Sequence, residues 1–277
     1  MTYRELYEIG KSRLTQAGIE EAALDARLLL EFVCRTARND LLVHGDRAVE
    51  AEQESAYREL IGRRSAHIPL QHLTGVSEFM GLEFMVNEDV LIPRQDTEIL
   101  VEEVMRNLHD GFRILDMCTG SGCILLSLLH YSNDCSGVGA DISEKALEVA
   151  RRNAQNLNET NVSFVNGDLF EKVEGKFEII VSNPPYIRTG VIPTLMEEVR
   201  LHEPVAALDG LADGLHFYRE IVKESKKYLC GGGQLFFEIG YDQREAVTAL
   251  MEQAGFRDVT AVQDYAGLDR VVYGSFY

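Results

Sequence analysis

The residues best suited to chemistry in this chain are Asn183, Pro184, Pro185 and Tyr186, in the stretch VSNPPYI. They follow a short apolar, β-branched run at 177–181, which predicts a buried strand. Prolines give no N–H to a sheet, and a residue before proline is held extended, so we expect Asn183 and Pro184 to turn their carbonyl groups outward. This makes a small site rich in acceptors, whose natural guest is an NH₂ group with two donors to satisfy.

An acceptor site of this kind can aim a weak nitrogen nucleophile. The nitrogen of a planar amide or aryl amine reacts poorly because its lone pair is delocalised. Holding both N–H groups from one side points the nitrogen at an electrophile on the other side, and Tyr186 can stack on the flat face of the guest. We therefore expect Asn183, Pro184 and Tyr186 to be catalytic and Pro185 to contact the substrate. The simpler alternative is that the two prolines only end the strand.

A glycine loop follows an earlier predicted strand. LDMCTGSGCI places Asp116 at the strand end and Gly120 and Gly122 before a helix. Glycines let a ligand approach the backbone, and a helix N-terminus offers free N–H groups. The loop is not a dinucleotide fingerprint, because Cys118 stands where the first glycine belongs and Leu125 where the last one does. A phosphate-binding loop would need Gly-Lys-Ser/Thr, which the chain lacks here.

Three acids end three successive predicted strands. Asp116 would repel a pyrophosphate but suits a ligand that carries an amine or a sulfonium. Asp141 can accept both hydroxyls of a ribose. Asp168 can accept from an exocyclic amine such as that of adenine, with Leu169 and Phe170 packing on the ring. Each acid alone could be a turn or capping residue, but the series favours a nucleoside site.

Strands and helices alternate from residue 112 onward. The order predicts an α/β domain with an open, largely parallel sheet, helices on both faces, and a ligand at the carboxyl ends of the strands. Gly231–Gly233 are expected to stop the helix that precedes them. We expect strands at 112–117, 137–142, 162–170, 177–182 and 234–240, two further strands near the C-terminus, and helices at 123–132, 144–157, 215–229 and 243–254.

The residues before this domain divide into two parts. Residues 1–75 have apolar side chains at helical spacing and almost no strand signal, which predicts a helical bundle without chemistry of its own. Residues 76–95 predict a β-hairpin linker that turns at Gly81 or Asn87. Asp96 or Thr97 is expected to cap a helix from Glu98, so the α/β domain is taken as 96–277.

Composition narrows the class of protein. The chain has 277 residues, of which 45% are hydrophobic and 26% charged, as in soluble globular proteins. It shows no signal-peptide pattern and no apolar run of about 20 residues, so we expect a cytoplasmic protein without a membrane span. Its five cysteines form no CxxC pair, so we expect neither a disulfide framework nor a metal site.

The charge argues against a nucleic acid substrate. The net charge is −18, and residues 1–75 carry 10 basic and 12 acidic side chains, against 17 and 33 in the remainder. A protein that neutralises many phosphates needs a basic face, which this distribution does not favour.

The motifs resemble a known family. Asp-x-x-Thr-Gly-Ser-Gly at 116–122, Asp141, Asp168 and Asn-Pro-Pro-Tyr at 183–186 resemble class I S-adenosylmethionine-dependent methyltransferases that act on planar nitrogens. PLQHLTGVSEFMGLEFMVNEDVLIPRQDTEILVE at 69–102 closely resembles the segment that joins the two domains of the release factor glutamine methyltransferases, the HemK/PrmC family. DARLLLEFVC resembles their helical N-terminal domain, so the resemblance covers nearly the whole chain.

The resemblance implies a fold and a reaction. The fold would be a Rossmann-like methyltransferase domain with a mostly parallel seven-stranded sheet and an antiparallel C-terminal strand, joined by the hairpin to a substrate-docking helical bundle. The reaction would be N5-methylation of the glutamine in the Gly-Gly-Gln loop of class 1 peptide release factors, with S-adenosylmethionine as donor. We expect a monomer with no metal.

The implied site residues fall into two sets. The cofactor set is Asp116, Cys118, Thr119, Gly120, Ser121, Gly122, Asp141, Ile142, Asp168, Leu169 and Asn183. The substrate set is Asn183, Pro184, Pro185, Tyr186 and Arg94. Leu169 departs from members that carry tryptophan there, which leaves the packing of the adenine open.

Some roles and alternatives stay open. Arg94 and Glu98 are expected at the pocket entrance, and His202 and Glu203 are expected to be structural or to line the substrate. We see no strong general base at the motif, and none is needed if the proton leaves after transfer. Two alternative functions remain, a nucleic acid amino-methyltransferase and a non-catalytic binding module.

Overall fold

The computed structural model describes residues 1–277, which separate into two units. The first contains residues 1–75 and 196–202 and is called the helical unit here. The second contains residues 76–195 and 203–277 and is called the sheet unit. The residues of the expected hairpin linker therefore belong to the sheet unit, and one short segment from late in the chain belongs to the helical unit.

The helical unit is a bundle around an aliphatic core. Thr2 begins its first helix with a capping box, in which Thr2 and Glu5 satisfy each other's backbone N–H groups. Tyr57 lies in the core, and its hydroxyl donates to the Ala26 carbonyl at 3.1 Å. The helices are α1 Tyr3–Gln16, α2 Ala22–Cys34, α3 Arg38–Val43, α4 Ala51–Arg64, α5 Leu70–Thr74 and α9 Glu197–His202.

A buried arginine attaches α9 to this bundle. Arg64 of α4 donates from Nε to Asp25 Oδ2 of α2 at 2.7 Å and from Nη2 to Glu198 Oε1 of α9 at 2.5 Å. Only about 5% of the Arg64 side chain is exposed, so the two carboxylates replace its lost hydration. This long-range pairing explains why a segment that sequence reasoning assigned to the α/β domain groups with the helices.

The sheet unit is built on a seven-stranded sheet with the order β5-β4-β3-β6-β7-β9-β8. β3 to β7 are parallel, and the C-terminal strand β9 is antiparallel to both of its neighbours. The predicted fold is confirmed, including the antiparallel last strand. The strands are β3 Arg113–Met117, β4 Ser136–Asp141, β5 Val162–Asn166, β6 Phe177–Ser182, β7 Leu229–Glu238, β8 Arg257–Gln263 and β9 Asp269–Phe276.

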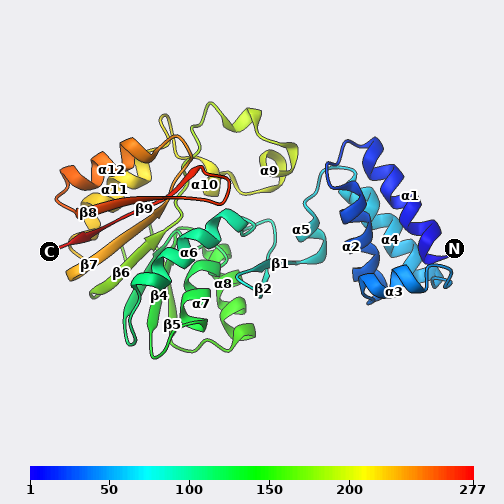
Figure 1. The fold of residues 1–277 in the computed structure, drawn as a ribbon, viewed down its shortest axis with the longest axis horizontal. Coiled ribbons are helices and arrows are strands. Elements are labelled where there is room, and N and C mark those ends of the chain that lie inside the picture. Colours follow the sequence, from blue (N-terminus) through cyan, green and yellow to red (C-terminus); the bar gives the residue numbers. More distant parts are fainter. The chain divides into compact units, whose positions relative to one another are not determined.

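Helices cover both faces of this sheet (Figure 1). Neighbouring residues of one strand point to opposite faces, so Ile179 packs in the core under α6 and α7, while Ile180 packs under α11 and α12. The helices are α6 Gln95–Asn107, α7 Cys123–His130, α8 Glu144–Leu157, α11 His216–Ser225 and α12 Arg244–Gln253. Two short helices, η1 Ile192–Thr194 and α10 Val205–Leu208, lie in the long connection after β6.

The hairpin of β1 Val76–Phe79 and β2 Leu82–Met85 turns at Gly81, as predicted. Gly81 has a φ of +71°, a conformation that glycine adopts without strain. Asn153 of α8 holds the hairpin by accepting from the Met85 N–H at 2.7 Å and donating to the Met85 carbonyl at 3.0 Å. The same side chain donates to the Ser121 carbonyl at 2.9 Å, so the hairpin and the glycine loop share one anchor.

Two local predictions were wrong. α6 begins at Gln95 with Arg94 as its N-cap, so Asp96 and Thr97 both lie inside the first turn and neither is the cap. Gly231–Gly233 belong to β7 and do not stop α11, which ends at Ser225. Leu229 pairs with Phe177 and Gln234 with Ile179, so β7 bulges where the glycines lie, and Gly232 has a φ of +82°. No helix combines the length and the apolar character needed to cross a membrane.

Candidate active site

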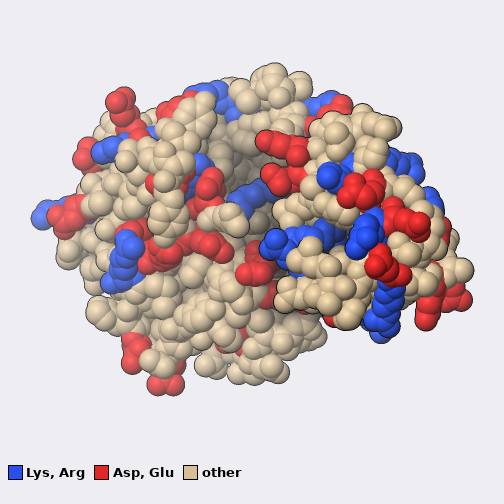
Figure 2. Space-filling model, turned by 45° about the vertical axis from the view of Figure 1, so that its right-hand side comes forward, with Lys and Arg blue, Asp and Glu red and all other residues tan.

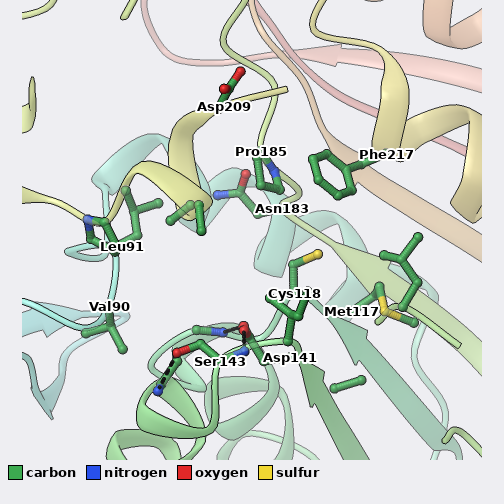
Figure 3. Close-up of a pocket in the computed structure, with 18 of the residues that line it drawn as sticks. Val90, Leu91, Met117, Cys118, Asp141, Ser143, Asn183, Pro185, Asp209 and Phe217 are labelled. Atoms are coloured by element: carbon green, nitrogen blue, oxygen red, sulfur yellow. Dashed lines mark hydrogen bonds between the residues drawn. The ribbon is translucent and has the colours of Figure 1, made fainter. Parts of the chain in front are cut away.

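The carboxyl ends of the parallel strands open into a cavity of about 510 Å³ in the sheet unit (Figure 3). This is the edge of a parallel sheet at which ligands are expected. The structure brings together in the cavity wall residues from all four predicted strand ends. These are Cys118, Gly120, Asp141, Ile142, Asp168, Leu169, Asn183 and Pro185.

Four other predicted residues shape the glycine loop and do not line the cavity: Asp116, Thr119, Ser121 and Gly122. Asp116 is fully buried, and its Oδ2 accepts from the Thr119 hydroxyl at 2.6 Å. Burial raises the pKa of Asp116 to about 7, against the effect of the Thr119 hydroxyl. Direct contact of these four residues with a cofactor stays a prediction.

Gly122 suits the close packing of the loop. It has a φ of +80°, and a Cβ there would lie 3.1 Å from Leu126 Cδ1 and 3.2 Å from Ala150 Cβ. A side chain at this N-cap would be strained by the positive φ and would crowd both neighbours, so glycine suits the close approach of α7 to α8. This places the N-terminus of α7 directly after the cavity wall.

Asp141 is held by the backbone on both carboxylate oxygens (Figure 3). The Gly120 N–H donates to Oδ2 and the Ser143 N–H to Oδ1, each at 2.9 Å. A carboxylate has about four lone-pair sites, so each oxygen keeps one for a ligand in the cavity. Burial raises the pKa of Asp141, while these N–H groups favour its charged form. The fixed carboxylate fits a vicinal diol such as that of ribose.

The wall beside Asp168 is apolar. Leu169 and Phe217 line it, so one aromatic side chain is available there for contact with a planar ring. Phe170 was expected to pack on the guest ring but instead stacks on Tyr228, with 4.7 Å between ring centroids, and is absent from the cavity wall. Sequence reasoning missed Phe217 because a single aromatic residue at a helix start carries no motif.

The Asn-Pro-Pro-Tyr segment follows β6 at the cavity. Asn183 and Pro185 line the wall, whereas Pro184 and Tyr186 do not. Asn183 Nδ2 donates a long hydrogen bond of 3.4 Å to Thr97 Oγ1 of α6, which leaves Oδ1 as the available acceptor. Figure 3 shows this amide at the cavity, above Cys118 and opposite Leu91.

Tyr186 is fixed at its side chain and its backbone. Its hydroxyl donates to Glu238 Oε1 at 3.2 Å, and its carbonyl accepts from Gln243 Nε2 at 3.0 Å. Gly214 leaves space for that carbonyl, because a Cβ at Gly214 would lie 2.4 Å from the oxygen. Stacking of Tyr186 on a substrate stays a prediction.

The remaining predicted residues make contacts outside the cavity wall. Arg94 pairs with the buried carboxylate of Glu203. Glu98 accepts from the Met80 N–H at 2.6 Å and so faces the hairpin. His202 ends α9 in the helical unit.

Two loops complete the cavity, and no sequence motif predicted that either of them would line it. One follows the hairpin, and the other follows Glu203 and includes α10. Their lining residues are Asp89, Val90, Leu91, Pro204, Val205, Ala206, Ala207, Asp209 and Leu211.

Comparison with known proteins assigns both units of this architecture to known domain families. Residues 5–75 match the PrmC N-terminal domain, and residues 94–200 match the methyltransferase small domain. A methyltransferase from Pyrococcus furiosus has the same fold, with a TM-score of 0.56 and 19% identity over 77% of this chain and 98% of that one. The sheet unit is thus a class I methyltransferase fold.

Curated relatives align with both units together. The release factor glutamine methyltransferase of Caulobacter vibrioides is 41% identical over 278 residues, which cover 99% of this chain and 96% of the relative. That of Geobacter sulfurreducens is 41% identical over 274 residues, with the same coverage of the two chains. An identity of this level over nearly the full length of both proteins shows the family. The chain belongs to the release factor glutamine methyltransferases.

Proposed function

We propose that this enzyme transfers a methyl group from S-adenosylmethionine to the side-chain amide nitrogen N5 of the glutamine in the Gly-Gly-Gln motif of class 1 peptide release factors. The observation that carries the proposal is the position of Asn183, whose free Oδ1 lies at a cavity that also holds the backbone-fixed carboxylate of Asp141. An acceptor for an NH₂ group and an acceptor for a nucleoside thus share one cavity.

The cofactor end of the cavity has groups suited to each part of a nucleoside. Asp141 would accept the ribose hydroxyls, Asp168 would accept from the adenine amine, and Leu169 and Phe217 would pack against the ring. S-adenosylmethionine supplies a methyl group on a positively charged sulfur. The acids around the cavity favour a cation there over an anionic nucleotide.

The substrate end works by positioning. Asn183 Oδ1 and the Pro184 carbonyl would accept the two N–H groups of the glutamine amide and hold its nitrogen toward the cofactor end. Asn183 is held through its Nδ2 by Thr97, and the two prolines restrict the backbone that follows it, so we expect little reorganisation when charge develops on the nitrogen. The Asn-Pro-Pro-Tyr motif itself contains no strong base, and the proton can leave to solvent after transfer.

The direct test is mass spectrometry of an intact release factor incubated with this protein and isotope-labelled S-adenosylmethionine. One labelled methyl group on the glutamine of Gly-Gly-Gln is expected. Labelling of another residue, or none, contradicts the proposed substrate. Asn183→Ala, which removes the side-chain acceptor of the motif, should abolish most of this labelling. Asn133→Ala, a change at an exposed asparagine, is its matched control.

A role for the helical unit follows from the same proposal. Residues 1–75 carry no motif for chemistry, and a protein substrate offers surface that the bundle can grip away from the glutamine. A chain that begins at Ser77 should still bind S-adenosylmethionine if it folds, but should methylate the intact factor far more slowly. A short Gly-Gly-Gln peptide should be a poor substrate for both forms. Equal activity of the two forms on the intact factor would exclude docking.

The nucleic acid alternative has less support. Acidic and basic side chains are interspersed on the face shown in Figure 2, and the chain has a net charge of −18. Binding to a phosphate backbone requires clustered basic residues and gives a strong dependence on salt. Efficient methylation of naked DNA or RNA by the full chain would reverse this preference.

A further inference from the structure

The backbone that follows the Asn-Pro-Pro-Tyr segment pairs with a loop from later in the chain. The Ile187 N–H donates to the Leu208 carbonyl at 3.0 Å, and the Gly210 N–H donates back to the Ile187 carbonyl at 2.8 Å. We call residues 204–214 the wall loop, because several of them line the cavity. These are Pro204, Val205, Ala206, Ala207, Asp209 and Leu211.

Two glycines of the wall loop allow it to lie against the backbone of Tyr186. A Cβ at Gly210 would lie 2.8 Å from Tyr186 Cα, and a Cβ at Gly214 would lie 2.4 Å from the Tyr186 carbonyl oxygen. Atoms at these distances overlap, so a side chain at either position would push the loop and the motif apart. The motif and the wall loop are therefore in direct backbone contact.

One buried side chain joins the motif to the wall loop. Gln243 is the N-cap residue of α12, and only 3% of its surface is exposed. Its Nε2 donates to the Tyr186 carbonyl at 3.0 Å and to the Gly214 carbonyl at 3.2 Å. The two N–H groups of a single amide thus bridge the motif and the loop.

The partners of the Gln243 amide specify its orientation. Nε2 faces two backbone carbonyls, which can only accept. Oε1 accepts from the Gly240 N–H at 2.9 Å, which can only donate, and lies 3.3 Å from the Tyr218 hydroxyl. The reversed amide would set an oxygen against two carbonyls and an NH₂ group against an N–H, so only the observed orientation satisfies these groups.

We infer that Gln243 is a positioning residue that holds the Asn-Pro-Pro-Tyr motif and the wall loop in one arrangement. The inference rests on the proposed function, in which Asn183 and the Pro184 carbonyl accept the reacting amide. Tyr186 follows Pro184 by two residues, and proline restricts the backbone between them, so a displaced Tyr186 carbonyl displaces the Pro184 carbonyl as well. A small misplacement of a group that orients the substrate is enough to slow a reaction strongly.

Gln243→Glu tests the two donors at almost constant shape. The new carboxyl keeps one oxygen for Gly240, but when ionised it turns its second oxygen toward the two carbonyls. When protonated it can donate to one of them, and burial raises the pKa of a carboxyl toward neutral pH. The kcat on a release factor should therefore lie about tenfold below the parent value at pH 8 and recover as the pH falls to 6.

Gln243→Met provides the matched comparison, because methionine fills a similar volume and offers no donor at any pH. Its loss in kcat should be the same at pH 6 and pH 8. Each variant rate is divided by the parent rate at the same pH, because the charged and titratable groups around position 243 are common to all three proteins. These groups are Tyr186, Tyr218, Glu238, Asp242, Arg244 and Arg270.

Val247→Ala is the control for general destabilisation. It removes buried volume one turn further along α12 and should leave kcat unchanged. A normal kcat in Gln243→Met, or a loss in Gln243→Glu that does not depend on pH, would overturn the positioning role. An equal loss of kcat in Val247→Ala would also overturn it.

Hydrogen exchange of the ligand-free protein tests the same linkage without a substrate. The N–H groups of Ile187, Thr189 and Gly210 bond between the end of the motif and the wall loop. They should exchange about tenfold faster in Gln243→Met than in the parent, whereas the amides of β6 should not change. Unchanged exchange at these three positions, or equally faster exchange in β6, would refute the inference. A parent protein that methylates no release factor would instead contradict the proposed function, and the exchange experiment would still decide the role of Gln243.

Discussion

The two ends of the cavity are held by different kinds of bonds. At the nucleoside end, backbone N–H groups of Gly120 and Ser143 fix Asp141, and these partners lie 21 and 2 positions away in sequence. At the substrate end, side chains hold the motif: Asn183 bonds to Thr97 across 86 positions, and Tyr186 bonds to Glu238 across 52. The cofactor end is therefore a local product of strand–loop–helix units, whereas the substrate end requires the assembled sheet.

The largest effect should come from the substrate end. Asn183→Ala removes the side-chain acceptor for the reacting amide, and kcat should fall by about 100-fold or more, as for loss of a positioned polar group elsewhere. Binding of S-adenosylmethionine should change little, because Asp141 and the glycine loop are untouched. Methyl transfer to a release factor at saturating cofactor measures kcat, and calorimetry with the cofactor alone measures its affinity. Normal turnover by a folded variant would refute the acceptor mechanism.

Asp141→Asn should give the opposite pattern. The new NH₂ group would face a backbone N–H of Gly120 or Ser143, and one acceptor for the ribose would be lost. Cofactor affinity should fall by about 1–3 kcal/mol, while kcat at saturating cofactor is largely kept. Calorimetry measures the affinity, and exposed Asp110→Asn is the matched control. Unchanged affinity would remove Asp141 from the cofactor site.

This difference also explains what the sequence could predict. Asp116, Asp141 and Asp168 lie at the ends of predicted strands, and the glycine loop follows the first of them, so pattern and chain order place them at one sheet edge. The same alternation predicted the largely parallel sheet with helices on both faces, and the family resemblance supplied the seven strands and the antiparallel last strand. The loops that close the cavity and the side chains behind the motif carried no such signal, because their partners are distant in sequence.

Thr97 and Glu238 show why sequence patterns could not predict the side chains behind the motif. Thr97 resembled a helix cap because threonine before an apolar helical run often caps, yet α6 starts earlier and its first turn presents Thr97 to Asn183. Glu238 was one residue of an expected strand, and nothing local distinguished it from a solvent-facing acid. Gly231–Gly233 were predicted to end a helix, but they lie at a bulge in β7. Glycine is common at both kinds of position, so the local sequence could not distinguish them.

Gln243 offers a test of how the substrate end is supported. Its buried Nε2 donates to the carbonyls of Tyr186 at 3.0 Å and Gly214 at 3.2 Å. Gln243→Leu leaves both carbonyls without this donor and should lower the free energy of unfolding by about 1–3 kcal/mol. Urea unfolding followed by circular dichroism measures this, with exposed Gln155→Leu as control. A stability equal to that of the control would show that other donors hold Tyr186.

The last prediction concerns Asp116 at the nucleoside end and the dependence of the free energy of unfolding on pH. Burial raises its pKa from an ordinary value of 3.8 to about 7, so the folded protein keeps a proton on Asp116 that the unfolded chain releases above about pH 4. The contribution of this group to stability is therefore present at low pH and is lost as the pH rises from about 4 to about 7. The slope should be at most about 1.4 kcal/mol per pH unit.

Asp116→Asn isolates this contribution, because asparagine is uncharged throughout and its Oδ1 can still accept from Thr119. Urea unfolding of the ligand-free protein at several pH values between 5 and 7 should show a stability gain for the variant that grows as the pH rises. The other carboxylates titrate in both proteins, so the difference between the two curves belongs to Asp116. Parallel curves would mean that Asp116 is ionised in the folded protein at pH 5. The loop would then have to stabilise a buried charge, and the backbone would support Asp116 as it supports Asp141.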